Sequence, residues 1–219
     1  MANPENTMNG NNVYLLTQIN PETTNGLVMQ LTQWVNALPI AKKTVNKHTK
    51  IYTPYEVIPD NIPVLNVWIN SCGGSFLQTA ALLNMFHIAS ARGAIVQTYN
   101  IGRAASCASM IAVSGTKGYR YMGQDNFNLI HYGNTRIEIN HPEEIVFKFK
   151  DFDKHLNDMY NIYQTNTKLT KEQINNYLKT EDEGQLFADD CLTYGVCDWV
   201  ITNDGRFVNN VAELKTKQR

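Results

Sequence analysis

The sequence has little charge, and neither sign prevails. Charged residues make up 18% of the 219 positions, and the formal net charge is −1. Proteins that bind nucleic acid through bulk electrostatics carry a clear positive excess, so we expect no nucleic-acid partner. The low charge also leaves neutral surface available for contacts between subunits.

Metal-binding patterns and long apolar runs are absent as well. The four cysteines form no CxxC pair, and the histidines do not flank them at zinc spacing. We therefore expect no metal and no cofactor. No window approaches the roughly 18 apolar residues of a membrane span, and the polar first dozen residues lack the apolar region of a secretory signal. We expect a flexible segment over residues 1–12, no membrane association and a cytoplasmic location.

What the sequence does have is an alternation of strand and helix patterns. Runs of strand character occupy residues 64–69, 94–101, 127–130 and 196–202. Helical apolar patterns occupy residues 27–38, 76–89 and 104–113. This alternation predicts an α/β fold with helices packed against a sheet. We expect one domain over residues 13–205 and a tail over residues 206–219.

A longer helix is predicted over residues 143–165. Glu143 and Glu144 stand at its start, where the positive end of the helix dipole stabilises acidic side chains. Apolar residues then recur in steps of three and four. This apolar stripe is difficult for a chain of this size to bury by itself. A homo-oligomer explains the stripe better than a monomer does.

Three local patterns could carry chemistry. In residues 69–75 (INSCGGS), two glycines follow a buried strand and free backbone N–H groups to turn toward a ligand; a plain strand-to-helix turn is the alternative. Ser106 lies among small residues before a helix, so its hydroxyl could be presented to a substrate; it could instead bond its own helix backbone. His131 ends an apolar strand, and it is either a general base or structural.

These patterns together resemble the Clp protease proteolytic subunit, within the crotonase-like superfold. The resemblance rests on four motifs in order, at residues 69–75 (INSCGGS), 102–107 (GRAASC), 129–131 (LIH) and 194–198 (YGVCD). It covers residues 14–202, and the step of 25 from Ser106 to His131 matches it. It implies a fold of repeated β-β-α units with a protruding handle helix at about residues 143–165.

The resemblance also implies roles for particular residues. Ser106 would be the nucleophile and His131 the general base, as in a serine peptidase. The N–H groups of Gly74 and Cys107 would form the oxyanion hole.

The acid of the triad is less clearly marked than its other two members. An ungapped match puts it on Glu183, with Asp182 as the rival. The resemblance further implies that Gly73, Ser75 and Tyr132 bind the substrate.

The family assembles into two stacked seven-membered rings, a tetradecamer that encloses the active sites. An AAA+ unfoldase feeds it with polypeptide substrates. The present chain has no GxxxxGK[ST] motif, so any use of ATP would belong to that partner.

Several alternative functions remain open from the sequence. A non-catalytic ring subunit and a phage head-maturation protease would share the fold. Acyl-CoA enzymes of the crotonase class typically use glutamates rather than a serine–histidine pair, and signal-peptide peptidases on this fold pair serine with lysine. A serine endopeptidase is therefore the leading hypothesis.

Overall fold

A mostly parallel sheet organises the molecule. The computed structural model describes residues 6–39, 50–132, 141, 143–179 and 184–215. Within these residues the strands follow the order β1-β2-β3-β4-β5-β8-β9, and β6 and β7 attach at the side through β4. The elements in chain order are β1 (Thr7–Asn9), β2 (Asn12–Leu15), α1 (Pro21–Ala37), β3 (Val64–Ser71), α2 (Phe76–Ala91), β4 (Ile95–Ala105), α3 (Cys107–Val113), β5 (Arg120–Gly123), β6 (Phe127–Leu129), α4 (Glu144–Asn166), α5 (Lys171–Lys179), β7 (Gln185–Leu186), α6 (Ala188–Thr193), β8 (Trp199–Ile201), β9 (Phe207–Val208) and α7 (Val211–Leu214).

The centre of the sheet is parallel, and its connections are helical. Strands β2, β3, β4, β5 and β8 pair in parallel, whereas β1 and β9 add antiparallel edges. Parallel neighbours need crossover connections, and α1, α2 and α3 supply them between successive strands from β2 to β5. The α/β fold predicted from the sequence is confirmed.

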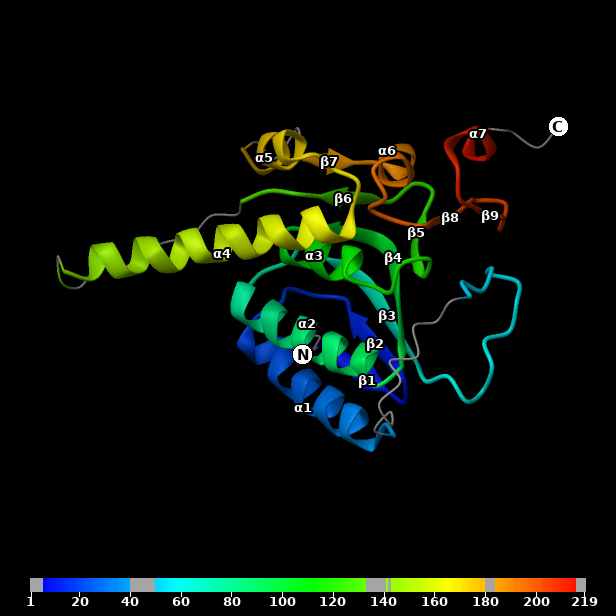
Figure 1. The fold of residues 1–219 in the computed structure, drawn as a ribbon, viewed down its shortest axis with the longest axis horizontal. Helices are drawn as coiled ribbons and strands as arrows, with labels where there is room; N and C mark the ends of the chain where they lie inside the picture. Colours follow the sequence, from blue (N-terminus) through cyan, green and yellow to red (C-terminus); the bar gives the residue numbers. More distant parts are fainter. Residues whose placement is uncertain (1–5, 40–49, 133–140, 142, 180–183, 216–219) are drawn as a thin grey trace, which may run out of the picture.

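Helices α1 and α2 lie side by side and cover one face of the sheet (Figure 1). They do so because each has an apolar stripe at helical spacing. Leu27, Leu31 and Val35 of α1 are buried together with Leu82 and Phe86 of α2. These side chains belong to the main hydrophobic core.

Strand β4 changes partner along its length. Its middle pairs with β5, from Thr98 to Asn100, and its last three residues pair with β6 instead. The sequence pattern predicts a strand over residues 94–101 and a helix over residues 104–113. That boundary was wrong, because pairing with β6 extends the strand to Ala105 and delays α3 until Cys107.

Helix α4 projects from the body of the molecule (Figure 1). It spans Glu144–Asn166, so the long helix predicted over residues 143–165 is confirmed. Met159 and Tyr163 anchor its C-terminal half in the core. In its N-terminal half, the apolar side chains of Phe147 and Phe149 are 68% and 54% exposed.

Regular structure also occurs where the sequence predicted none. Strand β1 lies within the segment over residues 1–12 that we expected to be flexible, and it pairs with β2. The buried Asn6 side chain accepts hydrogen bonds from the N–H groups of Leu16 and Thr17. In the expected tail over residues 206–219, β9 pairs with β8 and α7 follows. The domain limits remain predictions.

Candidate active site

Ser106 stands at the junction between β4 and α3, in an unusual backbone conformation. Its φ of 56° and ψ of −126° make it the one non-glycine residue with positive φ in the described part of the chain. Such a conformation costs about 1–3 kcal/mol and persists only where the surroundings impose it. The Ser106 N–H donates to the Leu129 carbonyl of β6 at 2.9 Å. The partner change of β4 thus holds the turn that presents this serine.

Gly73 lies directly against Ser106. A Cβ at Gly73 would be 2.7 Å from the Ser106 Cβ, 2.5 Å from the Ala105 carbonyl oxygen and 2.8 Å from the Cys107 nitrogen. Its φ of 89° is also one that other residues rarely adopt. Only glycine lets the two turns approach this closely.

Gly74 is braced from its other side by Ile19. The Ile19 N–H donates to the Gly73 carbonyl at 2.8 Å, and the Ser75 N–H donates to the Ile19 carbonyl at 2.6 Å. A Cβ at Gly74 would lie 2.1 Å from the Ile19 oxygen. Neither of these hydrogen bonds uses the Gly74 N–H, the group that the resemblance assigns to the oxyanion hole.

Ser71 fixes the start of the glycine turn, a role that the sequence patterns do not predict. Its hydroxyl donates to the Thr17 carbonyl at 2.6 Å and accepts from the Gly73 N–H at 3.1 Å. The residue is 1% exposed. The presence of a serine inside the INSCGGS motif is the one signal of this role in the sequence. Its partner Thr17, in the loop after β2, is too distant in the sequence to be predicted from it.

Cys107 follows Ser106, the predicted nucleophile, and begins α3. Its thiol donates to the Gly74 carbonyl at 3.1 Å, which ties the two predicted oxyanion donors together. Burial raises the pKa of this thiol, although hydrogen bonds from its surroundings oppose the shift. Cys107 therefore packs as a neutral side chain, and the oxyanion role that the resemblance implies falls on its backbone N–H.

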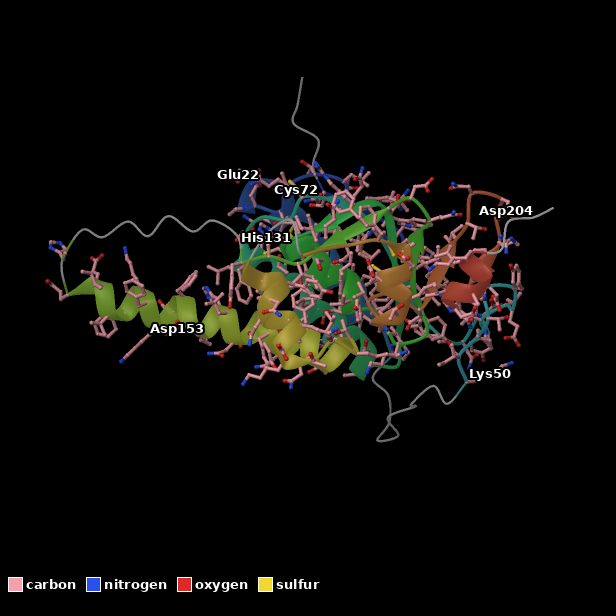
Figure 2. The ribbon with its side chains drawn as sticks, turned by 90° about the horizontal axis from the view of Figure 1, so that it is seen from above. Glu22, Lys50, Cys72, His131, Asp153 and Asp204 are labelled. Carbon is pink, nitrogen blue, oxygen red and sulfur yellow. The ribbon has the colours of Figure 1, made fainter. Side chains whose placement is uncertain are left out.

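His131 follows β6, and the backbone of this segment lies close to the backbone of the Ser106 turn. Strand β6 pairs with β4 up to Leu129 opposite Ala105, so the next residues of both strands leave the sheet together. His131 is half-buried. Figure 2 shows it with Cys72 at the end of the body from which α4 projects, whereas Lys50 and Asp204 lie at the opposite end. The fold therefore brings the predicted serine, histidine and glycine turn into one region.

The two candidate acids, Asp182 and Glu183, lie outside the described residues. Gly184 is the first described residue after them, and its carbonyl accepts from the Ile130 N–H at 2.9 Å. A Cβ at Gly184 would lie 1.8 Å from the Ile130 oxygen. The chain next to the candidate acids thus runs against the residue that precedes His131.

The residues predicted to bind substrate are partly engaged within the protein. Gly73 uses its N–H and carbonyl on Ser71 and Ile19. Ser75 donates its N–H to Ile19, and its hydroxyl caps α2. Tyr132 is half-buried and donates its N–H to the Leu178 carbonyl at 3.2 Å.

Within the described ranges, no group of three or more histidine, cysteine, aspartate or glutamate residues could hold a metal ion. None of the helices found there has both the length and the apolar character needed to cross a bilayer.

Comparison with known proteins decides the family. The model of the family described as Clp protease matches residues 56–204. The chain belongs to the Clp protease family. The match contains the glycine turn, Ser106, His131 and α4, and the α/β architecture is consistent with the fold of this family.

Individual members of the Clp protease family are distant in sequence. The ATP-dependent Clp protease proteolytic subunit of Streptococcus thermophilus is 26% identical over 152 residues, which cover 66% of this chain and 72% of that protein. The ATP-dependent Clp protease proteolytic subunit 1 of Corynebacterium glutamicum is 28% identical over 136 residues, covering 62% and 63%. Membership supports a peptidase of the Clp type.

Proposed function

We propose that the chain is a serine endopeptidase that cleaves polypeptides through an acyl-enzyme. The observation that carries the proposal is the strained Ser106, with its φ of 56° imposed by Gly73 and by the hydrogen bond to Leu129. A serine used only for packing would gain nothing from this conformation. The strain is typical of a nucleophile on a sharp strand-to-helix turn.

In the proposed mechanism Ser106 attacks the peptide carbonyl while His131 accepts its proton. His131 then returns the proton to the leaving amine, and water releases the acyl group by the same route. The N–H groups of Gly74 and Cys107 stabilise the negative oxygen of the tetrahedral intermediate. A donor of this kind contributes about 10²–10³ in rate.

We further propose Glu183 as the acid that orients His131, with Asp182 as the rival. Support comes from Gly184, whose carbonyl binds the N–H of Ile130. Because of this contact, the residue that follows the candidate acids lies beside the residue that precedes His131. A carboxylate there would hold the imidazole in the tautomer that accepts the serine proton.

The active form is proposed to be a homo-oligomeric ring that encloses the catalytic sites, with polypeptide entering from a partner AAA+ unfoldase. Support comes from the projecting half of α4, where Ile145, Val146, Phe147 and Phe149 are all exposed. Contiguous apolar side chains on a projecting helix are typical of a surface covered by another subunit. We propose a cytoplasmic location, because the two similar family members are named as subunits of ATP-dependent proteases.

Labelling with a fluorophosphonate, followed by intact-mass measurement, tests the peptidase proposal. We expect one adduct on the native protein and none on Ser106→Ala. Ser114→Ala is the matched control, because Ser114 ends the same helix and bonds the Met110 carbonyl; it should label as the native protein does. No adduct on a correctly folded, assembled native protein would refute the proposal.

The same assay identifies the acid. Glu183→Gln and Asp182→Asn are compared by their labelling rates, since loss of the orienting carboxylate slows the attack by Ser106. We expect the larger loss in Glu183→Gln.

A further inference from the structure

A chain of buried polar side chains lies behind the candidate catalytic residues. The Tyr163 hydroxyl donates to the Ser109 hydroxyl at 2.9 Å, and the Ser109 hydroxyl donates to the Asn128 side-chain oxygen. Ser109 and Tyr163 are 0% exposed and Asn128 is 1% exposed. Hydrogen bonds in such a dry setting are strong, and a broken one leaves a costly unsatisfied group.

The three side chains come from the three elements that meet behind the site. Ser109 is one helical turn after Ser106, and its N–H donates to the Ser106 carbonyl at 2.9 Å. Asn128 is in β6, three residues before His131. Tyr163 is in the anchored half of α4. The Ser109–Asn128 bond therefore joins the segment carrying the nucleophile to the segment carrying the base.

Backbone pairing alone gives β6 only a short hold. Strand β6 is three residues long and meets only the last three residues of β4. On its other side, β7 contributes two residues. A side-chain bond to α3 adds a second, differently directed restraint on β6. Misplacement of a reacting group by about 1 Å can cost about 10²-fold in rate, so such a restraint matters for catalysis.

Tyr163 determines which group donates in each of these hydrogen bonds. Burial raises the pKa of its phenol above the ordinary value. The hydroxyl therefore keeps its proton and remains a donor to Ser109. Ser109 is then left to donate to the Asn128 oxygen, which only accepts.

We propose that Tyr163, Ser109 and Asn128 form a positioning network that holds His131 in register with Ser106. The network acts through the two segments and does not touch the substrate. It rests on the proposed peptidase function, in which the alignment of serine and histidine limits the rate.

Tyr163→Phe tests the network, and Tyr160→Phe is its matched control. Both changes remove one hydroxyl from α4, but within the described chain the buried Tyr160 hydroxyl has no hydrogen-bond partner. The peptide kcat is measured per active site titrated with fluorophosphonate. We expect Tyr163→Phe to lower this kcat by about 10- to 100-fold with KM within about twofold. Tyr160→Phe should match the native protein.

Counting active sites separates positioning from simple loss of folded protein. If Tyr163→Phe merely unfolds some molecules, fewer sites titrate and kcat per site stays native, which would overturn the proposal. Ser109→Ala provides a second variant, because it breaks both bonds without touching α4. It should lower kcat per site at least as much as Tyr163→Phe does.

The NMR signals of the His131 imidazole test the network without turnover. With the resonances assigned by His131→Gln, we expect Tyr163→Phe to shift their positions and Tyr160→Phe to leave them native. Unchanged His131 signals in Tyr163→Phe would overturn the network. Failure of the native protein to label at Ser106 would instead refute the peptidase function, so the two failures are distinguishable.

Discussion

Replacing Gly73 with alanine should damage the site and the fold together. A Cβ there would meet the Ser106 Cβ at 2.7 Å and the Ala105 oxygen at 2.5 Å, both far inside contact distance. The φ of 89° adds strain for any residue with a Cβ. Gly93 is the matched control, because its φ is 88° but an added Cβ would have no heavy atom within 4 Å.

The two glycines separate backbone strain from steric overlap. Conformational strain alone costs about 1–2 kcal/mol, and this is the loss of unfolding free energy expected for Gly93→Ala. Gly73→Ala carries the same strain and also the overlap, and forced overpacking adds about 1–3 kcal/mol. For Gly73→Ala we therefore expect the free energy of unfolding to fall by about 2–5 kcal/mol in total. The distortion should be largest at the Ser106 turn, where the added Cβ overlaps.

Chemical denaturation gives the two free energies, and fluorophosphonate labelling gives the state of the site. Gly93→Ala should label at the native rate, whereas Gly73→Ala should label much more slowly even where it is fully folded. Equal stability of the two variants, together with native labelling by Gly73→Ala, would refute the claim that Gly73 is required for the approach to Ser106.

Two further predictions concern stability. Asp198→Asn should cost about 3–5 kcal/mol, because the charge of Arg120, which is 4% exposed, loses its partner at 2.6 Å. Asp204→Asn breaks the half-exposed pair with Arg206 and should cost much less than that. Similar losses in the two denaturation curves would contradict this reasoning. Burial raises the pKa of the Cys191 thiol well above its ordinary value near 9. Below pH 9 the contribution of this thiol to the free energy of unfolding is therefore complete. Above pH 9 the thiol ionises only in the unfolded chain, and the free energy of unfolding falls by about 1.4 kcal/mol per pH unit. Replacing Cys191 with alanine should flatten the fall in a pH series of denaturation curves, and an unchanged slope would exclude this thiol as its cause.

Local patterns were sufficient to predict the elements that depend on short-range physics. Asn20 followed by Pro21 is a sequence signal for a helix start, and α1 begins there, since the Asn20 side chain accepts from the Thr23 N–H as an N-cap. Helix α4 follows from its apolar spacing. The positions of Ser106 and His131 in one region follow from the resemblance, because four motifs in order are specific.

Contacts between distant segments could not be predicted in the same way. The sequence gives no sign that β4 changes partner, because that depends on where β6 docks. Ser71 bonds Thr17 across the chain, and the Tyr163–Ser109 bond joins residues 54 positions apart. The sequence around a single polar residue in an apolar run does not indicate which distant residue will be its hydrogen-bond partner. The triad acid remains a prediction, since both candidates lie outside the described residues.

The partner change of β4 also bears on when during folding the site arises. The Ser106 turn is held by Leu129 and by Gly73, so it needs β6 and the β3–α2 turn to have docked already. Non-local and parallel pairings form slowly, because they close long loops before they gain contacts. A chain that has formed only its local helices therefore has Ser106 without its strained turn. The proposed hydrolytic activity would then begin only with the completed fold, which would spare a half-folded chain and its neighbours from premature cleavage.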